Sequence, residues 1–335
     1  MRSARIARML GSSFARFVLL MFAVSIVTFA LVAASPIDPV QANTGQTALL
    51  SMSAAKRAQL AERWGVGVPV WQRYLSWLKG AIHGDLGTSL RFNEPVASVV
   101  AERFLNSFAL LVVAWVLSGV FGLVLGVIAG VTRGSLADRI IRGYCYLLSA
   151  TPTFWLAVLL LMVFSVYLGW FPMGFSSAIG GAAEDPAIGE RLYHLVLPAL
   201  ALSVTGVANI ALHTREKVVD VMASSYVRFA RTRGEGTHSI VFRHGLRNLV
   251  LPALTLQFSQ ISEVFGGSVL VEQVFSYPGL GQAAVTAGLG GDAPLLVGIA
   301  LASAAIVFGG NLVANLLYGI IDPRMRRGAD HAESC

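Results

Sequence analysis

The chain has 335 residues, of which 55% are hydrophobic and only 13% are charged. Soluble domains carry about 25% charged residues, so the composition favours a membrane protein over soluble domains. The formal net charge of +7 comes from short basic patches between apolar runs, which weighs against nucleic acid binding, and two cysteines are too few for a disulfide framework or a cysteine metal cluster.

Six apolar runs are long enough to cross a membrane, because a bilayer core of about 30 Å requires about 20 helical residues. We expect spans near residues 14–34, 105–131, 140–168, 193–212, 250–274 and 295–321. The first run could also be a cleaved signal peptide, since Ala33, Ala34 and Ser35 follow it, but it is longer than the ~7–15 apolar residues usual in such peptides. The sequence therefore predicts an all-α integral membrane protein with about six transmembrane helices.

The segment between the first two spans, residues 35–104, predicts a small subdomain outside the membrane. Residues 52–64 and 70–81 show the apolar spacing of helices. Most of the 25 Lys and Arg residues lie on the opposite side of the expected spans. By the positive-inside rule, both termini are then cytoplasmic and residues 35–104 are extracytoplasmic.

Small residues recur every four positions in the second span, at Ser118, Gly122, Gly126 and Gly130. Such a stripe lets another helix backbone approach closely, so helix packing is its expected role. Pro152 and Pro198 predict kinked helices in the third and fourth spans. No internal repeat is visible, which weighs against a secondary transporter built from inverted repeats.

The chain lacks the motifs of an enzyme or a motor. The only lysines are Lys56, Lys79 and Lys217, and none follows a glycine, so there is no phosphate-binding G-x-x-x-x-G-K-[ST] loop. The six histidines form no H-E-x-x-H pair. We therefore expect no catalytic residue, metal or cofactor in this chain, and any energy from ATP has to come from another polypeptide.

The basic segment 225–252 has helix-forming stretches on both sides of Gly234. It could simply be a positive loop that fixes topology. Alternatively, it forms a short helix along the membrane surface that docks on a cytoplasmic motor subunit, with Tyr226, Phe229 and Ala230 as its contact stripe. The arginines that would meet acidic groups or lipid phosphates are Arg228, Arg231 and Arg233.

Polar residues follow at three-residue steps in the fifth span, at Gln257, Gln260 and Glu263. Polar atoms inside a membrane face protein or water rather than lipid, and an ionisable group there marks a pathway by default. We predict that this stripe lines a pore and that Glu263 tolerates cationic or amine-bearing cargo. The alternative is an interhelical hydrogen bond.

Glycine and proline residues flank a short apolar piece around the end of the fifth span, at Gly266, Gly267, Pro278, Gly279 and Gly281. This punctuation suits a bend or a re-entrant turn more than a straight span, and such a turn is tolerated only if it is buried in protein or lines a cavity. We predict that it contributes to a gate.

Several motifs occur in collinear order along the chain. They are WQRYLSWL followed by GDLGTSL at 84–90, SATPTFW at 149–155, LVLPALALS before the basic segment, the basic segment itself, GGSVLVEQVFSYPGLG at 266–281 and NLVANLLYGIIDPRMR at 311–326. Together they resemble the permease subunits of bacterial ABC importers for dipeptides, oligopeptides and nickel. The basic segment resembles the family's EAA motif, the coupling helix that sits in a cleft of the ATPase subunit.

The coupling motif departs from the general pattern of the family in two places. Arg228 and Phe229 stand where the general motif has Glu and Ala, whereas Ala230 and Gly234 match it. The resemblance includes peptide-type permeases with the same Arg variant. It therefore implies an ATPase partner of the peptide type.

The resemblance also implies how the chain is organised as an ABC importer type I-like permease. The expected parts are a cytoplasmic N-terminus with the first span in 1–34, the extracytoplasmic subdomain in 35–104, a core permease domain in 105–323 with a cytoplasmic coupling loop in 213–249, and a cytoplasmic tail in 324–335. The chain would lie in the bacterial cytoplasmic (inner) membrane.

The implied function is that of a pore-forming subunit that imports di- or oligopeptides. The implied partners are a second, homologous permease, two cytoplasmic ATPases that bind ATP-Mg, and an extracytoplasmic substrate-binding protein. Nickel or a metal chelate is the alternative cargo. A stand-alone secondary transporter is the alternative class of protein.

Overall fold

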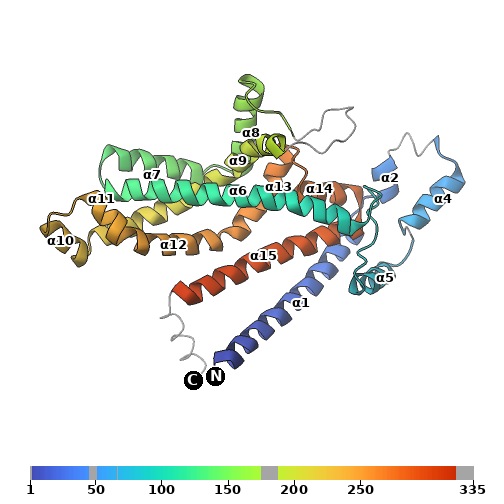
Figure 1. Ribbon diagram of the computed structural model, residues 1–335. Helices are drawn as coiled ribbons and strands as arrows, with labels where there is room; N and C mark the ends of the chain where they lie inside the picture. Colours follow the sequence, from blue (N-terminus) through green and yellow to red (C-terminus); the bar gives the residue numbers. More distant parts are fainter. Residues whose placement is uncertain (1, 45–50, 66, 175–187, 322–335) are drawn as a thin grey trace. The chain divides into compact units, whose positions relative to one another are not determined.

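The computed structural model describes residues 2–44, 51–65, 67–174 and 188–321 (Figure 1). Within these ranges the regular structure is helical, and the one bridge between extended residues joins Thr88 to Pro95. The first half contains α1 (Arg2–Ala34), α2 (Pro39–Thr44), α4 (Ala54–Arg63), α5 (Val70–Ile82), α6 (Val96–Val131), α7 (Leu136–Ser149), α8 (Thr153–Leu160) and the π-helix η1 (Leu161–Tyr167). The second half contains α9 (Ile188–Met222), α10 (Ser225–Thr232), α11 (Thr237–Ile240), η2 (Val241–Gly245), α12 (Leu246–Ser259), α13 (Ile261–Val274), α14 (Leu280–Gly290) and α15 (Ala293–Ile321).

Among the described residues, four helices are long and apolar enough to cross a membrane. They are Ser13–Ala34 within α1, the whole of α6, the whole of α9, and Ala293–Ala314 within α15. A fifth span is added if α7 is taken together with α8 and η1, two arms that are bent by 104°. These helices confirm the predicted all-α membrane fold for the described part of the chain. The orientation of the termini stays a prediction.

The predicted third span, residues 140–168, is broken rather than straight. α7 ends at Ser149, and α8 begins at Thr153 with Pro152 in the position before it. Proline lacks an N–H and disfavours helical dihedrals in the preceding residue, so one helix does not run through this point. The kink expected at Pro152 is confirmed, and the bend is far sharper than that of a kinked single helix. In contrast, α9 continues through Pro198 without interruption.

The predicted fifth span, residues 250–274, is also divided. α12 and α13 have 14 residues each and meet at Gln260. The Gln260 N–H donates to the Leu256 carbonyl at 3.2 Å, and the Gln260 carbonyl accepts from the Val264 N–H at 3.0 Å. Each helix alone is shorter than the about 20 residues that a span requires, so the predicted span needs both helices together.

The chain forms two compact units. One consists of Met1–Ser107 with Pro278–Phe308, and the other of Phe108–Tyr277 with Gly309–Cys335. The boundaries predicted at residues 34, 104 and 323 were placed by membrane topology. The two units are defined by compactness, so they do not test these boundaries, which stay predictions. The predicted tail, 324–335, lies outside the described residues.

In the first unit α1 runs antiparallel to the beginning of α15 (Figure 1). The rings of Phe17 and Phe308 have centroids 5.0 Å apart at one end of the pair. At the other end, the buried side chain of Phe29 packs against Ala293. α5 joins this end through Tyr74, whose ring lies edge-on to Phe29 with centroids 5.5 Å apart. Aromatic packing therefore fixes α5 beside the end of α1.

A buried carboxylate holds the loop that follows α5. Asp292, fully buried, precedes α15, and its Oδ2 atom accepts hydrogen bonds from Ser89 Oγ at 2.7 Å and from the N–H groups of Leu90 at 2.8 Å and Arg91 at 3.0 Å. Its Oδ1 atom accepts from the Leu295 N–H at 3.2 Å, which caps α15. Three donors from one loop compensate the desolvation of this charge and fix the loop to the start of α15.

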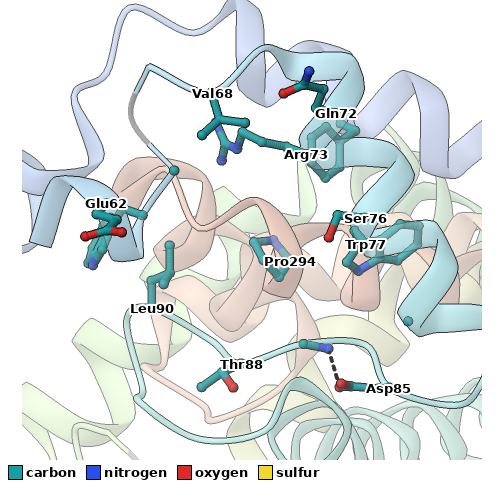
Figure 2. A pocket seen from close by; sticks show the side chains of 15 residues that line it. Glu62, Val68, Gln72, Arg73, Ser76, Trp77, Asp85, Thr88, Leu90 and Pro294 are labelled. Atoms are coloured by element: carbon teal, nitrogen blue, oxygen red, sulfur yellow. Dashed lines mark hydrogen bonds between the residues drawn. The ribbon is translucent and has the colours of Figure 1, made fainter. Parts of the chain in front are cut away.

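A pocket of about 710 Å³ lies between this loop, α4 and α5 (Figure 2). Trp77 on α5 donates from its indole Nε1 to the Leu86 carbonyl at 3.1 Å, which ties the loop to the helix. Three charged side chains line the pocket from three different segments: Glu62 on α4, Arg73 on α5 and Asp85 in the loop.

In the second unit, α6 and α9 approach each other through glycines. A Cβ atom placed on Gly122 would lie 2.7 Å from the Ile210 Cβ, and one placed on Gly126 would lie 2.6 Å from the Thr214 Cβ. Real Cβ atoms do not tolerate such distances, so only glycine permits this contact. The packing role predicted for the small-residue stripe is confirmed at these positions.

Candidate functional site

A pocket of about 290 Å³ lies in the second unit where α8, α9 and the α12–α13 junction meet. Its polar lining residues are Ser149, Thr151, Thr153, Thr205, Asn209, Gln260 and Glu263. Among the described residues that line it, Glu263 is the one ionisable residue, and its side chain is exposed. We call this hollow the membrane-unit pocket.

The chemistry of the membrane-unit pocket is that of amides and hydroxyls around one carboxylate. Asn209 and Gln260 each present a carbonyl acceptor and an NH₂ donor. Thr151 already donates its hydroxyl hydrogen to the Leu147 carbonyl at 2.8 Å, so its oxygen faces other groups as an acceptor. The pocket therefore matches a ligand that carries amide groups and a positive charge.

Two of the three residues in the predicted polar stripe reach this pocket, and the third does not. Gln260 and Glu263 line it, whereas Gln257 is 3% exposed and faces α6. Gln257 Nε2 donates to the Trp115 carbonyl and to Ser118 Oγ, the latter at 3.1 Å, while Trp115 Nε1 donates to the Gln257 carbonyl at 3.0 Å. Gln257 thus makes interhelical hydrogen bonds, as the alternative prediction had it. We do not propose a pore role for Gln257.

The predicted gate residues in the second unit lie on α13. Gly266 and Gly267 are both helical, and Gly267 lines the membrane-unit pocket next to Thr153. Ser276, two residues after the end of α13, has φ 48°, a left-handed conformation that a non-glycine residue rarely adopts. The Tyr277 N–H then donates to the Glu272 carbonyl at 2.8 Å, which closes the helix end.

The remaining predicted gate residues belong to the first unit. Pro278 and Gly279 precede α14, and Gly281 lies in its first turn. The Pro278 carbonyl accepts from Asn106 Nδ2 at 2.9 Å, and the Leu280 N–H donates to Ser107 Oγ at 2.7 Å. These bonds fix the beginning of α14 to α6. The predicted turn is therefore a short helix with a bonded start, and its gate role stays a prediction.

The predicted coupling segment forms α10, a helix of eight residues. Val227 and Ala230 are buried against Ile240 in a small internal cluster. Tyr226 and Phe229 point outward and are 43% and 64% exposed. The exposed contact stripe therefore consists of the two aromatic residues, while Ala230 fixes the helix from within.

The end of α10 has the geometry of a glycine-terminated helix. Gly234 adopts φ 82°, and the Glu235 N–H donates back to the Ala230 carbonyl at 3.2 Å. A side chain at residue 234 would be strained in this conformation, so this helix end favours glycine. Three exposed arginines surround the aromatic pair: Arg228, Arg231 and Arg233.

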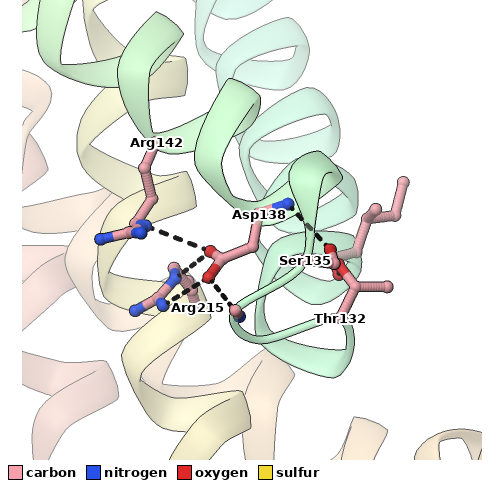
Figure 3. Close-up of polar contacts among 7 residues, drawn as sticks. Thr132, Ser135, Asp138, Arg142 and Arg215 are labelled. Carbon is pink, nitrogen blue, oxygen red and sulfur yellow. Dashed lines mark hydrogen bonds and ion pairs between the residues drawn. The ribbon is translucent and has the colours of Figure 1, made fainter.

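A buried ion cluster links α7 to the end of α9, and the sequence analysis did not identify it (Figure 3). Asp138 is fully buried. Its carboxylate accepts two hydrogen bonds from Arg215, at 2.6 and 2.9 Å, one from the Gly134 N–H at 2.9 Å, and an ion pair from Arg142 at 3.3 Å. Arg215 lies seven residues before the end of α9, which is followed closely by α10.

One local signal could have identified part of this cluster. Ser135 and Asp138 have the S-x-x-D spacing of a helix start, and Ser135 Oγ accepts from the Asp138 N–H at 3.3 Å. That signal predicts the beginning of α7. The partner Arg215 is 77 positions away, so only the folded arrangement reveals the ion pair.

Comparison with known proteins decides which family this architecture belongs to. Residues 122–327 match the model of the family described as binding-protein-dependent transport system inner membrane component. The chain belongs to this family. The match includes α7 to α15 and therefore the membrane-unit pocket, α10 and the Asp138 cluster.

Curated relatives match almost the whole length of this inner-membrane transport component. The chain is 35% identical to the oligopeptide transport system permease protein AppB of Bacillus subtilis over 91% of this chain and 95% of the relative. It is 32% identical to the dipeptide transport system permease protein DppB of Escherichia coli over 90% and 94%. It is 33% identical to the di/tripeptide transport system permease protein DppB of Pseudomonas aeruginosa over 96% and 98%.

Family membership confirms three expectations from the sequence. The chain is a permease component of the ABC importer type, it is a transport subunit rather than an enzyme, and it is a multi-pass protein of the cytoplasmic membrane. Each of its relatives above is named as a peptide permease, so the nickel alternative is not favoured.

Proposed function

We propose that this chain is the pore-forming permease subunit of an ATP-driven importer for di- and oligopeptides. In this proposal it pairs with a second, homologous permease, receives cargo from an extracytoplasmic substrate-binding protein and is driven by two cytoplasmic ATPases that bind ATP-Mg. The names of the relatives support the cargo, and membership of a binding-protein-dependent family supports an assembly over a stand-alone transporter.

The observation that carries the cargo proposal is the composition of the membrane-unit pocket. A peptide has backbone amides that exchange hydrogen bonds with neutral amides and hydroxyls, and it has an ammonium group that a carboxylate attracts. Gln260, Asn209 and Glu263 offer these partners in one hollow. Neutral polar groups also release a ligand more readily than a ring of charges, which suits a site that cargo has to leave.

The proposed path of the driving motion starts at α10. Exposed aromatic residues next to arginines are typical of protein interfaces, and Tyr226 and Phe229 form such a pair. We propose that these side chains enter the partner ATPase and that Arg228 and Arg233 meet acidic groups at its surface. The buried side of α10, with Ala230, then transmits the displacement to the rest of the unit.

The Asp138 cluster supports transmission from α10 towards the membrane-unit pocket. α10 follows α9, and Arg215 ties the last part of α9 to the start of α7. α9 also supplies Thr205 and Asn209 to the pocket. A helix that is paired at one end and lines the pocket further along moves as one element, so movement of α10 is expected to reach the cargo site.

Replacement of Glu263 tests the role of the membrane-unit pocket. The Glu263→Gln variant is expected to lower uptake of peptides with a free amino group by about tenfold, because a charge-assisted hydrogen bond is lost. Uptake of N-acetylated peptides should change much less. Glu216→Gln, an exposed residue of α9 that does not line the pocket, is the matched control. Unchanged uptake of every cargo by Glu263→Gln would remove the pore role of this residue.

A further inference from the structure

The pocket between α4, α5 and the loop held by Asp292 has a separate chemistry from the membrane-unit pocket. Its charged residues are two carboxylates, Glu62 and Asp85, and one guanidinium, Arg73. Figure 2 shows that these three side chains come from different segments around the same hollow. Groups of both signs therefore face one space of about 710 Å³, which is within the range of small-molecule sites.

Arg73 lines the pocket, and contacts of its side chain hold the guanidinium in place. Its Cζ atom lies 5.9 Å from the centroid of the Phe29 ring, a cation–π arrangement. Its stem passes Gly65, where a Cβ atom would come within 3.1 Å of Arg73 Nε. Gly65 adopts φ 66°, so this residue both tolerates the backbone conformation and leaves room for Arg73. A positioned guanidinium matches the two oxygens of a carboxylate.

The opposite charges are contributed by exposed carboxylates. Glu62 is an exposed residue near the end of α4. Asp85 also lines the pocket, and it uses one oxygen to accept the Gly87 N–H at 2.8 Å, which fixes the side chain. Both carboxylates attract an ammonium group, and Asp85 does so from a preorganised position.

Apolar and neutral polar groups line the pocket together with the charged ones. Trp77 and Pro294 form apolar surface next to Ser76 and Thr88, whose hydroxyls donate and accept hydrogen bonds (Figure 2). The Asp292 bonds fix the loop that carries Thr88, so the wall is formed before any ligand arrives. Preorganisation of this kind lowers the entropy that binding has to offset.

From this arrangement we infer that the α4–α5 pocket binds a small zwitterion with an apolar body, namely a short peptide, at a site separate from the membrane-unit pocket. Arg73 binds its carboxylate, Glu62 binds its ammonium group, and Asp85 adds a second negative charge to the same hollow. The charge pattern by itself supports a zwitterion. The choice of a peptide among zwitterions rests on the proposed function. The site offers cargo a first contact in the segment predicted to be extracytoplasmic.

The test measures equilibrium binding of a radiolabelled dipeptide to the complete importer in lipid nanodiscs, without ATP and without the substrate-binding protein. The variants Arg73→Gln and Glu62→Gln are each expected to weaken binding about tenfold or more, since each removes a charged hydrogen-bond partner. For peptides with an amidated C-terminus, Arg73→Gln should no longer weaken binding, because these peptides carry no terminal carboxylate. For peptides with an acetylated N-terminus, Glu62→Gln should no longer weaken binding, because these peptides carry no terminal ammonium group. Lys79→Gln, an exposed residue of α5 outside the pocket, is the matched control and should bind as the wild type does.

Three results would overturn the inference. One is binding that is unchanged in both pocket variants, and another is binding that Glu263→Gln abolishes while the pocket variants retain it. The third is weaker docking of the substrate-binding protein in the pocket variants with unchanged dipeptide binding, which would make the pocket a protein contact. Glu62→Gln changes an exposed side chain, so its result stands even if Arg73→Gln assembles poorly. ATP-dependent uptake, measured separately, reports on the proposed function and not on this site.

Discussion

Asp138 and Arg215 form a two-pronged ion pair that joins the start of α7 to the end of α9. The Nε–Oδ1 and Nη2–Oδ2 distances are 2.6 and 2.9 Å. The Asp138 side chain is 1% exposed and the Arg215 side chain 17% exposed. Removal of one partner from a buried pair leaves an uncompensated charge, which is more costly than the loss of the contact itself.

The variant Asp138→Asn should therefore be strongly destabilised, by about 3–5 kcal/mol. Thermal unfolding of the purified complex in detergent measures this loss. Arg139→Gln, an exposed neighbour on α7, is the control and should unfold near the wild-type temperature. The double variant Asp138→Asn/Arg215→Gln should lose less than the sum of the two single variants, because neither charge is then left alone. Additive losses would contradict the pairing.

The α6–α9 contact predicts a steric effect at Gly126. A Cβ atom there would lie 2.6 Å from Thr214 Cβ and 2.7 Å from the Ala211 carbonyl oxygen, and backbone atoms do not yield easily. Gly126→Ala should destabilise the protein by about 1–3 kcal/mol through overpacking. Gly143→Ala on α7 has no atom within 4 Å of the new Cβ, so it should be neutral or slightly stabilising. Equal unfolding temperatures for the two variants would rule out the close approach.

The exposed aromatic residues of α10 predict a separation of stability from coupling. Phe229→Ala should leave the unfolding temperature unchanged, because the ring is 64% exposed, but should lower peptide uptake per ATP hydrolysed. Val227→Ala, at a fully buried position on the same helix, should instead lower stability. Uptake and ATP hydrolysis are measured together in proteoliposomes. Full coupling in Phe229→Ala would show that α10 does not contact the motor through this ring.

The Asp292 contacts predict that an amide does not replace the carboxylate. In Asp292→Asn an NH₂ group would face N–H donors at one of the two oxygen positions, so at least one bond is replaced by repulsion between donors. We expect a loss of about 1–3 kcal/mol and faster proteolysis of the loop that contains Ser89. Ser89→Ala removes one donor to the same oxygen and the acceptor of the Phe92 N–H, but it leaves both backbone donors to Asp292 in place, so it should have a smaller effect. A larger effect of Ser89→Ala would contradict the central place of Asp292.

Long apolar runs were sufficient to predict α1, α6, α9 and α15, because the about 20 residues of a span carry a strong signal. The 104° bend after α7 was predicted only as a kink, since Pro152 marks a break but not its angle. The interruption at Gln260 has no proline or glycine to announce it. The local sequence therefore carries no signal for this interruption.

The polar stripe of the fifth predicted span shows the same limit for the candidate site. Its spacing singled out three polar residues of the predicted fifth span, and two of them line the membrane-unit pocket. The sequence left the direction of Gln257 open, because that depends on Trp115 and Ser118 in another helix. Long-range pairs such as Asp138 and Arg215 are missing from local patterns for the same reason.

The most direct test of the central claim is uptake of labelled dipeptides and oligopeptides into proteoliposomes that contain this chain with the proposed partner permease, ATPases and substrate-binding protein. The proposed function predicts uptake of peptides that requires both ATP and the binding protein. It predicts no uptake of nickel. Peptide uptake by this chain alone, without ATP, would contradict an importer subunit, and ATP-dependent uptake of nickel but not of peptides would contradict the proposed cargo.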